Sequence, residues 1–204
     1  MRIEMVGGLG VGKSTMCRIF NGKGFNVVYE DLSSNPFLSD SYRDPAKYAF
    51  PSQMNFVMDK YKTMLSETED EVYVYDQSFA ANRAYNSLLS DRDLYWGHAV
   101  VNEALHFAEA TFGRPDIIIN FQCDPAVQVE RIKRRGRSFE TVDEKFVVSL
   151  RKALDFEINH TYGKDLKNGH IKYEEIDVSN CNVDDYVSFV DKIITGYDLK
   201  AKVL

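Results

Sequence analysis

The stretch GGLGVGKST, residues 7–15, decides the fold. It satisfies the motif G-x-x-x-x-G-K-S/T from Gly7 to Ser14, after the β-rich run RIEMV (residues 2–6) and before a segment with helical spacing. Its glycines allow backbone N–H groups to turn inward around phosphate oxygens. The N-terminus of the following helix adds partial positive charge. The stretch therefore predicts a phosphate-binding loop for a nucleoside triphosphate.

This loop carries the first set of expected contacts, with ATP as phosphate donor. Lys13 is expected to bridge the β- and γ-phosphates, and Ser14 is expected to ligate Mg²⁺. The loop residues expected to contact ATP are Gly7, Gly8, Leu9, Gly10, Val11, Gly12, Lys13, Ser14 and Thr15. The motif does not specify an acceptor, so GTPase, ATPase and small-molecule kinase all remain open at this point.

Five short β-rich runs alternate with longer segments of helical spacing: RIEMVGG, NVVYE, VYVYD, PDIIINF and IKYEEIDVS. Such alternation predicts a parallel sheet covered by helices on both faces. We expect a P-loop NTPase-type α/β fold, a three-layer α/β/α arrangement around a five-stranded parallel sheet, as a single domain over residues 1–204. Helices are expected over about 46–67, 91–111, from Pro125 behind an Asp124 cap, 143–159 and 184–195.

Composition limits the function classes. The chain has 204 residues, a net charge of −6 and an apolar fraction of 44%, which is typical of a soluble globular protein and argues against a general nucleic-acid-binding surface. No apolar run approaches the roughly 20 residues that span a bilayer. Three widely spaced cysteines (Cys17, Cys123 and Cys181) without a C-x-x-C pair predict neither disulfides nor zinc. We expect a cytoplasmic protein that binds neither membranes nor nucleic acids.

Two carboxylates end predicted strands. Glu30 follows NVVY, and Asp76 follows VYVY. Ligands gather at the carboxyl ends of strands in open α/β sheets. Glu30 is therefore a candidate base that deprotonates an attacking hydroxyl, and Asp76 is a candidate magnesium-side carboxylate together with Ser14.

The segment RIKRRGRSFE, residues 131–140, is a concentrated positive patch in an acidic chain. Gly136 in its middle is suited to an Arg-rich lid over about 131–140 that closes on the nucleotide. Arg131, Arg135 and Arg137 are expected to contact ATP phosphates, and Arg135 is a candidate catalytic residue because a guanidinium stabilises a transferring phosphoryl group.

From residue 1 to about residue 160, the sequence resembles the deoxynucleoside kinase family, which includes deoxycytidine, deoxyguanosine and deoxyadenosine kinases. The resemblance rests on the order and spacing of five motifs: GGLGVGKST, YE (29–30), SYRDPAKYAFPSQ (41–53), DQS (76–78) and RIKRRGRSFE. It implies that Glu30 is the catalytic base, that Tyr42 and Glu140 hold the sugar 3′-hydroxyl, and that Gln53 pairs with the base. It also implies a homodimer.

Three positions depart from the family pattern. Gln77 stands where the family has an Arg after the acidic residue, Asn82 where members often have an Asp, and Lys60 where an Arg often lies. We therefore assign these three residues to substrate binding in an altered base pocket. The departures are compatible with an unusual nucleobase, a nucleotide acceptor or weakened catalysis.

Three functional hypotheses follow. The leading one is ATP- and Mg²⁺-dependent phosphorylation of the 5′-hydroxyl of a deoxynucleoside. The second is a nucleoside monophosphate kinase resembling thymidylate kinase, in which Lys60, Arg43 or Arg83 binds the acceptor's own phosphate. The third is a nucleotide-binding protein with weakened catalysis, for which Gln77 is the supporting residue.

Overall fold

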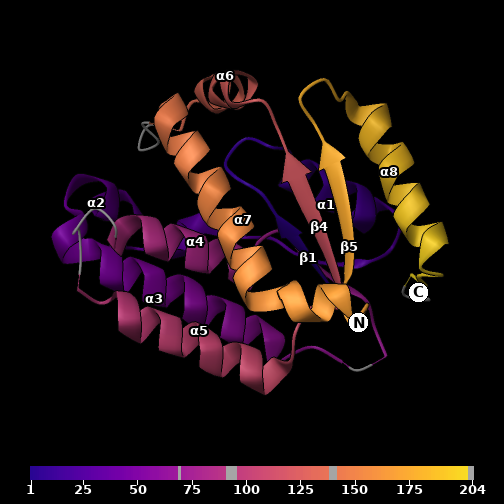
Figure 1. Cartoon of the computed structure of the whole chain (residues 1–204), viewed down its shortest axis with the longest axis horizontal. Helices are drawn as coiled ribbons and strands as arrows, with labels where there is room; N and C mark the ends of the chain where they lie inside the picture. Colours follow the sequence, from indigo (N-terminus) through magenta and orange to yellow (C-terminus); the bar gives the residue numbers. More distant parts are fainter. Residues whose placement is uncertain (69, 91–95, 138–141, 202–204) are drawn as a thin grey trace.

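The fold is built on one parallel sheet, seen in a computed structural model that describes residues 1–68, 70–90, 96–137 and 142–201. Five strands lie in the order β2-β3-β1-β4-β5 (Figure 1). Each lies within one of the five β-rich runs of the sequence: β1 (Arg2–Val6), β2 (Asn26–Val28), β3 (Tyr73–Tyr75), β4 (Ile117–Gln122) and β5 (Lys172–Asp177). The predicted five-stranded parallel sheet is confirmed.

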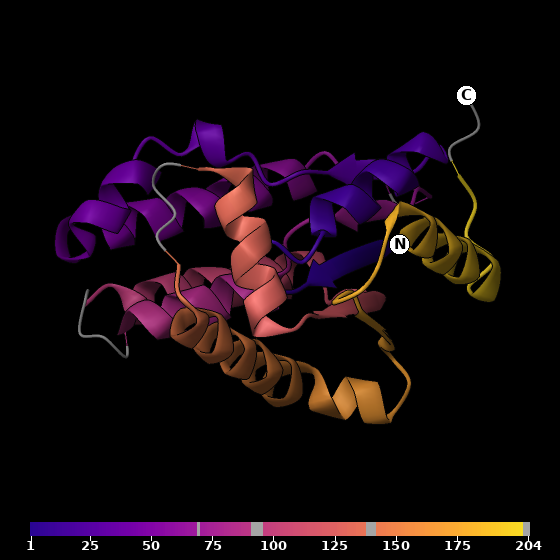
Figure 2. The same ribbon diagram turned by 90° about the horizontal axis from the view of Figure 1, so that it is seen from above.

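Helices cover both faces of the sheet. The helices are α1 (Lys13–Gly22), α2 (Leu38–Arg43), α3 (Pro45–Met64), α4 (Phe79–Ser90), α5 (His98–Phe112), α6 (Pro125–Arg135), α7 (Glu144–Lys167) and α8 (Val183–Gly196), with one 3-10 turn at Leu32–Ser34. Figure 2 shows α7 on the opposite side of the sheet from α1. The predicted three-layer arrangement is confirmed.

The alternation of side chains along β4 explains the two covered faces. Ile117 and Ile119 pack with α1 and α8 in one apolar cluster, whereas Ile118 packs with α4 and α7 in another. All three isoleucines are fully buried. A third cluster joins α3 and α5 to the end of β3, so this helix pair extends the molecule beyond one end of the sheet (Figure 1).

One helix start agrees with the prediction, whereas other helices differ from it. Pro125 opens α6, and the Asp124 carboxylate accepts from Ala126 N–H and Val127 N–H as expected. The sequence pattern did not predict α2 or α4, because residues of low helix propensity recur in both: Ser and Asp in α2, and Ser and Asn in α4. Helix α7 extends to Lys167, since Tyr162 is fully buried beyond the predicted end at about residue 159.

Helix α3 buries Val57 and Met64, whereas Met58 is 55% exposed. The first part of the predicted helix at 91–111 falls on residues 91–95, outside the part of the chain that the structure describes.

The three cysteines form no disulfide among the described residues. All three cysteines are free thiols, and the Cys17 thiol lies in the core, 3.5 Å from the sulfur of Met5. Across residues 1–68, 70–90, 96–137 and 142–201, no helix combines the length and apolarity needed to cross a membrane.

Candidate active site

The phosphate loop joins β1 to α1 at the carboxyl end of the central strand. Gly10 and Gly12 have φ angles of 74° and 94°, in the left-handed region that favours glycine. A Cβ at Gly12 would lie 2.3 Å from the hydroxyl oxygen of Tyr186, which donates to the Val11 carbonyl at 3.0 Å. Helix α8 therefore packs directly against the loop through Tyr186, and position 12 has room for glycine alone.

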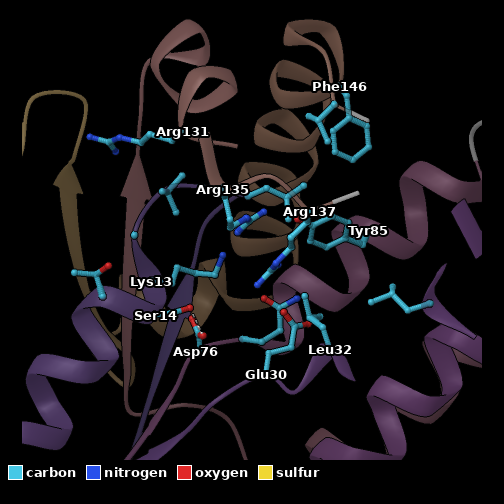
Figure 3. A pocket seen from close by; sticks show the side chains of 18 of the residues that line it. Lys13, Ser14, Glu30, Leu32, Asp76, Tyr85, Arg131, Arg135, Arg137 and Phe146 are labelled. Atoms are coloured by element: carbon cyan, nitrogen blue, oxygen red, sulfur yellow. Dashed lines mark hydrogen bonds between the residues drawn. The ribbon is translucent and has the colours of Figure 1, made fainter. Parts of the chain in front are cut away.

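Lys13 and Ser14 lie at the start of α1 and face the cavity (Figure 3). The Lys13 ammonium donates to the carbonyl oxygens of Gly7 at 2.9 Å and Gly8 at 2.8 Å. Burial lowers the pKa of Lys13, and the nearby carboxylate of Asp76 opposes that shift. The lysine therefore places a positive charge directly over the loop that would hold the phosphates.

Asp76 and Ser14 form the oxygen cluster at which a magnesium ion would fit. The Ser14 hydroxyl donates to Asp76 Oδ2 at 2.6 Å. Asp76 is 6% exposed, and its Oδ1 has no hydrogen-bond partner among the described residues. Mg²⁺ is usually bound by one or two carboxylates together with substrate phosphates and water. The described residues contain no group of three or more His, Cys, Asp or Glu side chains arranged to hold a metal ion by themselves. The pair therefore fits a magnesium ion that depends on bound phosphates.

Glu30 follows β2 and lies opposite the cationic groups of the cavity. Figure 3 shows Lys13, Arg135 and Arg137 converging above Glu30 and Asp76. Burial raises the pKa of Glu30 to about 7. The charge of Lys13 counteracts this rise, and that of Asp76 adds to it. A carboxyl group with a pKa near neutrality is suited to accepting a proton in catalysis.

The arginines of the predicted lid divide into two groups. Arg135, at the end of α6, and Arg137, just beyond it, point into the cavity near Lys13 (Figure 3). Arg131 points away from Lys13, and its guanidinium donates to the main-chain carbonyl of Val178 at 2.8 Å. Arg131 therefore lines the cavity while its guanidinium is bonded to the segment after β5, and its contact with ATP stays a prediction.

The cavity continues from the phosphate loop into a pocket between α2, α3 and α4, with a total volume of about 720 Å³. Tyr42, Gln53, Gln77 and Asn82 all line this cavity, as the sequence predicted for substrate-binding residues. Asn82 is 5% exposed, and its Oδ1 has no hydrogen-bond partner among the described residues. The pocket thus offers amide groups, and an aromatic wall that includes Phe56 and Tyr85.

This geometry agrees with a comparison against known families. A family model described as deoxynucleoside kinase matches residues 3–195, nearly the whole chain. The chain belongs to the deoxynucleoside kinase family. The strand order, the phosphate loop and the two strand-terminal carboxylates are thus features of a deoxynucleoside kinase family member.

Curated relatives carry several nucleoside specificities. A deoxyguanosine kinase of Lactobacillus johnsonii is 28% identical over 152 residues, which are 68% of this chain and 65% of that protein. A deoxyadenosine kinase of Dictyostelium discoideum is 29% identical over 147 residues, covering 68% and 58% of the two chains. A deoxyadenosine/deoxycytidine kinase of Bacillus subtilis is 29% identical, covering 68% and 67%. The matches to the first two span less than two thirds of those relatives.

Solved structures show the same fold. A deoxyadenosine kinase from M. mycoides, solved with the products dCMP and a flexible dCDP, superposes with a TM-score of 0.77 and 21% identity, covering 97% of this chain and 100% of that chain. The same kinase with bound dATP gives a TM-score of 0.76 and 21% identity, covering 96% and 100%. The α/β fold of this family member is therefore that of the deoxyadenosine kinase structures.

Two residues that the sequence assigns to substrate binding, Lys60 and Glu140, are absent from the described cavity lining. Lys60 does not line the cavity. Its ammonium lies below the pocket, 2.6 Å from the main-chain oxygen of Gln77 and 3.7 Å from the carboxylate of Glu4. Glu140, predicted to contact the sugar, lies outside the described residues.

Sequence reasoning missed two residues that shape the site. Tyr186 supports the phosphate loop from α8, and Glu4 lies fully buried in the central strand beneath the pocket. Neither residue belongs to a motif. The charge of Glu4 within the apolar run RIEMV was the one available signal, because a carboxylate in a central strand requires buried partners.

Proposed function

We propose that the protein transfers the γ-phosphoryl group of ATP to the 5′-hydroxyl of a deoxynucleoside. One observation carries this proposal. The carboxylate of Glu30 lies where the cationic phosphate end of the cavity meets the pocket built by α2, α3 and α4. A hydroxyl held at this junction would face a base on one side and the phosphate donor on the other.

Each group has a distinct part in the proposed reaction. The 5′-oxygen attacks the γ-phosphorus while its proton passes to the Glu30 carboxylate, and the bond to the β–γ bridging oxygen breaks to release ADP. Lys13, Arg135 and Arg137 stabilise the charge that spreads over the phosphoryl oxygens. Ser14 and Asp76 would hold Mg²⁺, which neutralises phosphate charge when it is bound.

The charges of the pocket favour a nucleoside over a monophosphate as acceptor. Among the described residues, the cavity lining contributed by α2, α3 and α4 includes no Lys or Arg. Three cations of these helices that could bind an acceptor phosphate lie outside the cavity lining. Arg43 is on the surface, Arg83 forms an ion pair with Glu109 at 2.5 Å, and Lys60 is buried below the pocket.

The base pocket is proposed to be altered relative to the family pattern. Gln53 offers both a donor and an acceptor to a base edge, and Asn82 presents a carbonyl oxygen without a partner among the described residues. Because Asn82 is neutral, it can also donate, which an ionised Asp in its place cannot do. This pair supports recognition of a base through amide groups alone.

A panel of acceptors tests the proposed function. We expect transfer of labelled γ-phosphate from ATP to at least one natural or modified deoxynucleoside, in a reaction that requires Mg²⁺. Deoxynucleoside monophosphates should give no labelled diphosphate, because the acceptor end lacks a cation to pair with a second phosphate. Thin-layer chromatography of the products separates the two outcomes.

Two results would contradict this proposal. Preferred transfer to dTMP over thymidine would favour the monophosphate kinase. Nucleotide binding without transfer to any acceptor would favour a protein with weakened catalysis. In that case Gln77→Arg, which restores the family residue, should raise turnover on ordinary deoxynucleosides.

We also propose that two copies associate through α3 and α5. These helices pack side by side (Figure 1), and together they expose Met58 of α3, Leu65 directly after it, and Val100 and Phe107 of α5. Val100 and Phe107 are seven residues apart and so lie on one face of α5, and Met58 and Leu65 have the same spacing at the end of α3. This exposed apolar stripe supports the homodimer that the family resemblance implies, with a second copy of the chain as its partner.

A charge within this stripe is expected to separate the two copies. Phe107 is 62% exposed and stacks on Tyr61 across the helix pair. Phe107→Glu should therefore shift the mass measured by light scattering from twice the chain mass of 23.4 kDa to that mass. Phe156→Glu on α7 is the matched control, because Phe156 is 61% exposed but lies outside the stripe. A monomeric wild-type protein, or an unchanged mass for Phe107→Glu, would contradict the proposal.

The cellular setting stays a prediction. The three free thiols support a reducing compartment, in agreement with the expected cytoplasmic location. Fractionation of cells followed by immunoblotting would test it.

A further inference from the structure

The most unusual feature outside the cavity is a group of buried charges below the acceptor pocket. Glu4 of β1 is completely buried, and one oxygen of its carboxylate lies 3.1 Å from Arg2 Nε and 3.7 Å from Lys60 Nζ. Lys60 of α3 is 8% exposed. Its ammonium also lies 4.3 Å from the ring centre of Phe79 and 5.1 Å from that of Tyr75. The Lys60 ammonium is therefore buried between the carboxylate of Glu4 and the aromatic rings of Tyr75 and Phe79.

Lys60 and Glu4 hold the two ends of one short turn. The Lys60 ammonium donates to the main-chain oxygen of Gln77 at 2.6 Å. The second oxygen of Glu4 accepts from the backbone N–H of Phe79 at 3.1 Å. Gln77 and Phe79 are only two residues apart, between the end of β3 and the start of α4. The Lys60–Glu4 pair therefore fixes the path of the backbone through this turn.

The turn carries groups of both halves of the active site. Asp76, at its start, accepts the hydroxyl hydrogen of Ser14 beside the phosphate loop. Gln77 lines the cavity, and Ser78 caps α4 by accepting from Ala81 N–H at 2.9 Å. Helix α4 in turn presents Asn82 to the acceptor pocket. A shift of the turn would therefore displace the phosphate end and the acceptor end together.

A contribution to stability does not by itself explain why Lys60 and Glu4 form a buried ion pair beneath the pocket. Replacing a buried ion pair by neutral groups of similar size is often neutral or stabilising, because desolvation offsets the attraction. Burial lowers the pKa of Lys60 to about 8, although Glu4 counteracts the shift, so the charged form is disfavoured by its surroundings. A neutral apolar side chain at position 60 could not donate the hydrogen bond that Lys60 makes to the main-chain oxygen of Gln77.

We propose that Lys60 is a positioning residue for phosphoryl transfer, which acts by fixing the Asp76–Gln77–Ser78 turn from beneath the pocket. Lys60 thus does not read the base. It holds the segment in which this chain has Gln77 in place of the family's arginine. The inference rests on the proposed function, since it concerns the same transfer.

The test uses Lys60→Met alone and together with Glu4→Gln. The single change leaves the Glu4 charge with Arg2 as its one remaining cation and can impair folding. The double variant also removes the buried anion, Arg2 keeps its hydrogen bonds to the carbonyl oxygens of Phe112 and Gly113, and the new amide oxygen can still accept from Phe79 N–H. We expect the double variant to be folded by thermal unfolding. Its kcat should be at least about tenfold lower, while the KM for ATP should change less than about threefold.

Two further variants complete the design. Lys60→Arg keeps a charged donor and should recover part of the lost kcat, because a guanidinium can still reach a carbonyl oxygen. Lys62→Met, on the exposed side of the same helix, is the matched control and should behave like the wild type.

The outcomes separate the two proposals. A wild-type kcat in the double variant would overturn the inference, since Lys60 would then serve only to neutralise Glu4. Equal loss of kcat in Lys60→Arg and Lys60→Met would also overturn it. A wild-type protein that phosphorylates no deoxynucleoside would instead refute the proposed function itself.

Discussion

Glu30→Gln is expected to lower kcat for transfer to the deoxynucleoside by a factor of about 10²–10⁴, the usual contribution of a general base. The amide has nearly the same shape as the carboxylate, so the cavity keeps its form while the group that accepts the proton is lost. The cations Lys13, Arg135 and Arg137 remain in place. The affinity for ATP, measured by calorimetry, should therefore change little.

The pH dependence of kcat/KM in the wild type is a second test of Glu30 as the base. Burial raises the pKa of Glu30 to about 7; Lys13, Lys60 and Arg137 counteract this rise, and Asp76 adds to it. A base must be deprotonated to act, so kcat/KM for the nucleoside should rise with pH and level off above about 7. This rise should be absent from the residual activity of Glu30→Gln.

Thermal unfolding and a control variant show whether Glu30→Gln loses activity through a loss of structure. The raised pKa means that the folded protein disfavours the ionised form of Glu30, so that ionisation lowers stability progressively as the pH rises to about 7. Glu30→Gln removes this effect, and its Tm at pH 8 should equal or exceed that of the wild type. Glu130→Gln, on an exposed position of α6, should leave kcat unchanged. Retention of full activity by Glu30→Gln would rule out Glu30 as the base.

Lys13→Met is expected to lower kcat by a factor of about 10²–10³ or more, and to raise the KM for ATP. The Lys13 ammonium lies over the carbonyl oxygens of Gly7 and Gly8, where the phosphates would replace these contacts. Methionine fills similar space but offers no charge to the developing oxyanions. Steady-state kinetics at varied ATP would measure both effects.

The acceptor pocket gives an internal control for this variant. Tyr42, Gln53 and Asn82 belong to α2, α3 and α4 and are separate from the loop, so deoxynucleoside binding should persist. Lys23→Met, at the far end of α1 where the lysine pairs with Asp191 on the surface, should keep both kinetic constants. A modest effect of Lys13→Met, equal to that of Lys23→Met, would show that the loop does not hold the transferred phosphate.

Much of the fold could be read from local pattern. The five strands fall within the five β-rich runs, and Asp124 caps α6 where the sequence places it. These features depend on residues that are close in the chain, such as glycines in a turn or an acceptor before Pro125. Helix α4, whose local pattern is weak, also receives part of its N-terminal support from Glu4, 75 residues earlier in the chain.

The candidate site could be predicted where strands set the positions. Ser14 and Asp76 are separated by 62 residues, yet the ends of β1 and β3 bring them within 2.6 Å. Arg131 and Lys60 show the limit of this reasoning. Each was assigned to a ligand because it is a cation near a motif. In the structure Arg131 donates to the main-chain oxygen of Val178 and Lys60 to that of Gln77, which the sequence did not indicate.

The sequence by itself determined the phosphate loop, the parallel sheet and the edge at which Glu30 and Asp76 lie. Backbone conformation and strand periodicity are local properties, and the carboxyl ends of parallel strands share one edge. Only the tertiary structure decided which charges face the cavity and which lie beneath it. Burial and pairing arise when distant segments pack together, so the role of Lys60 depends on Glu4 in β1 and on the turn before α4.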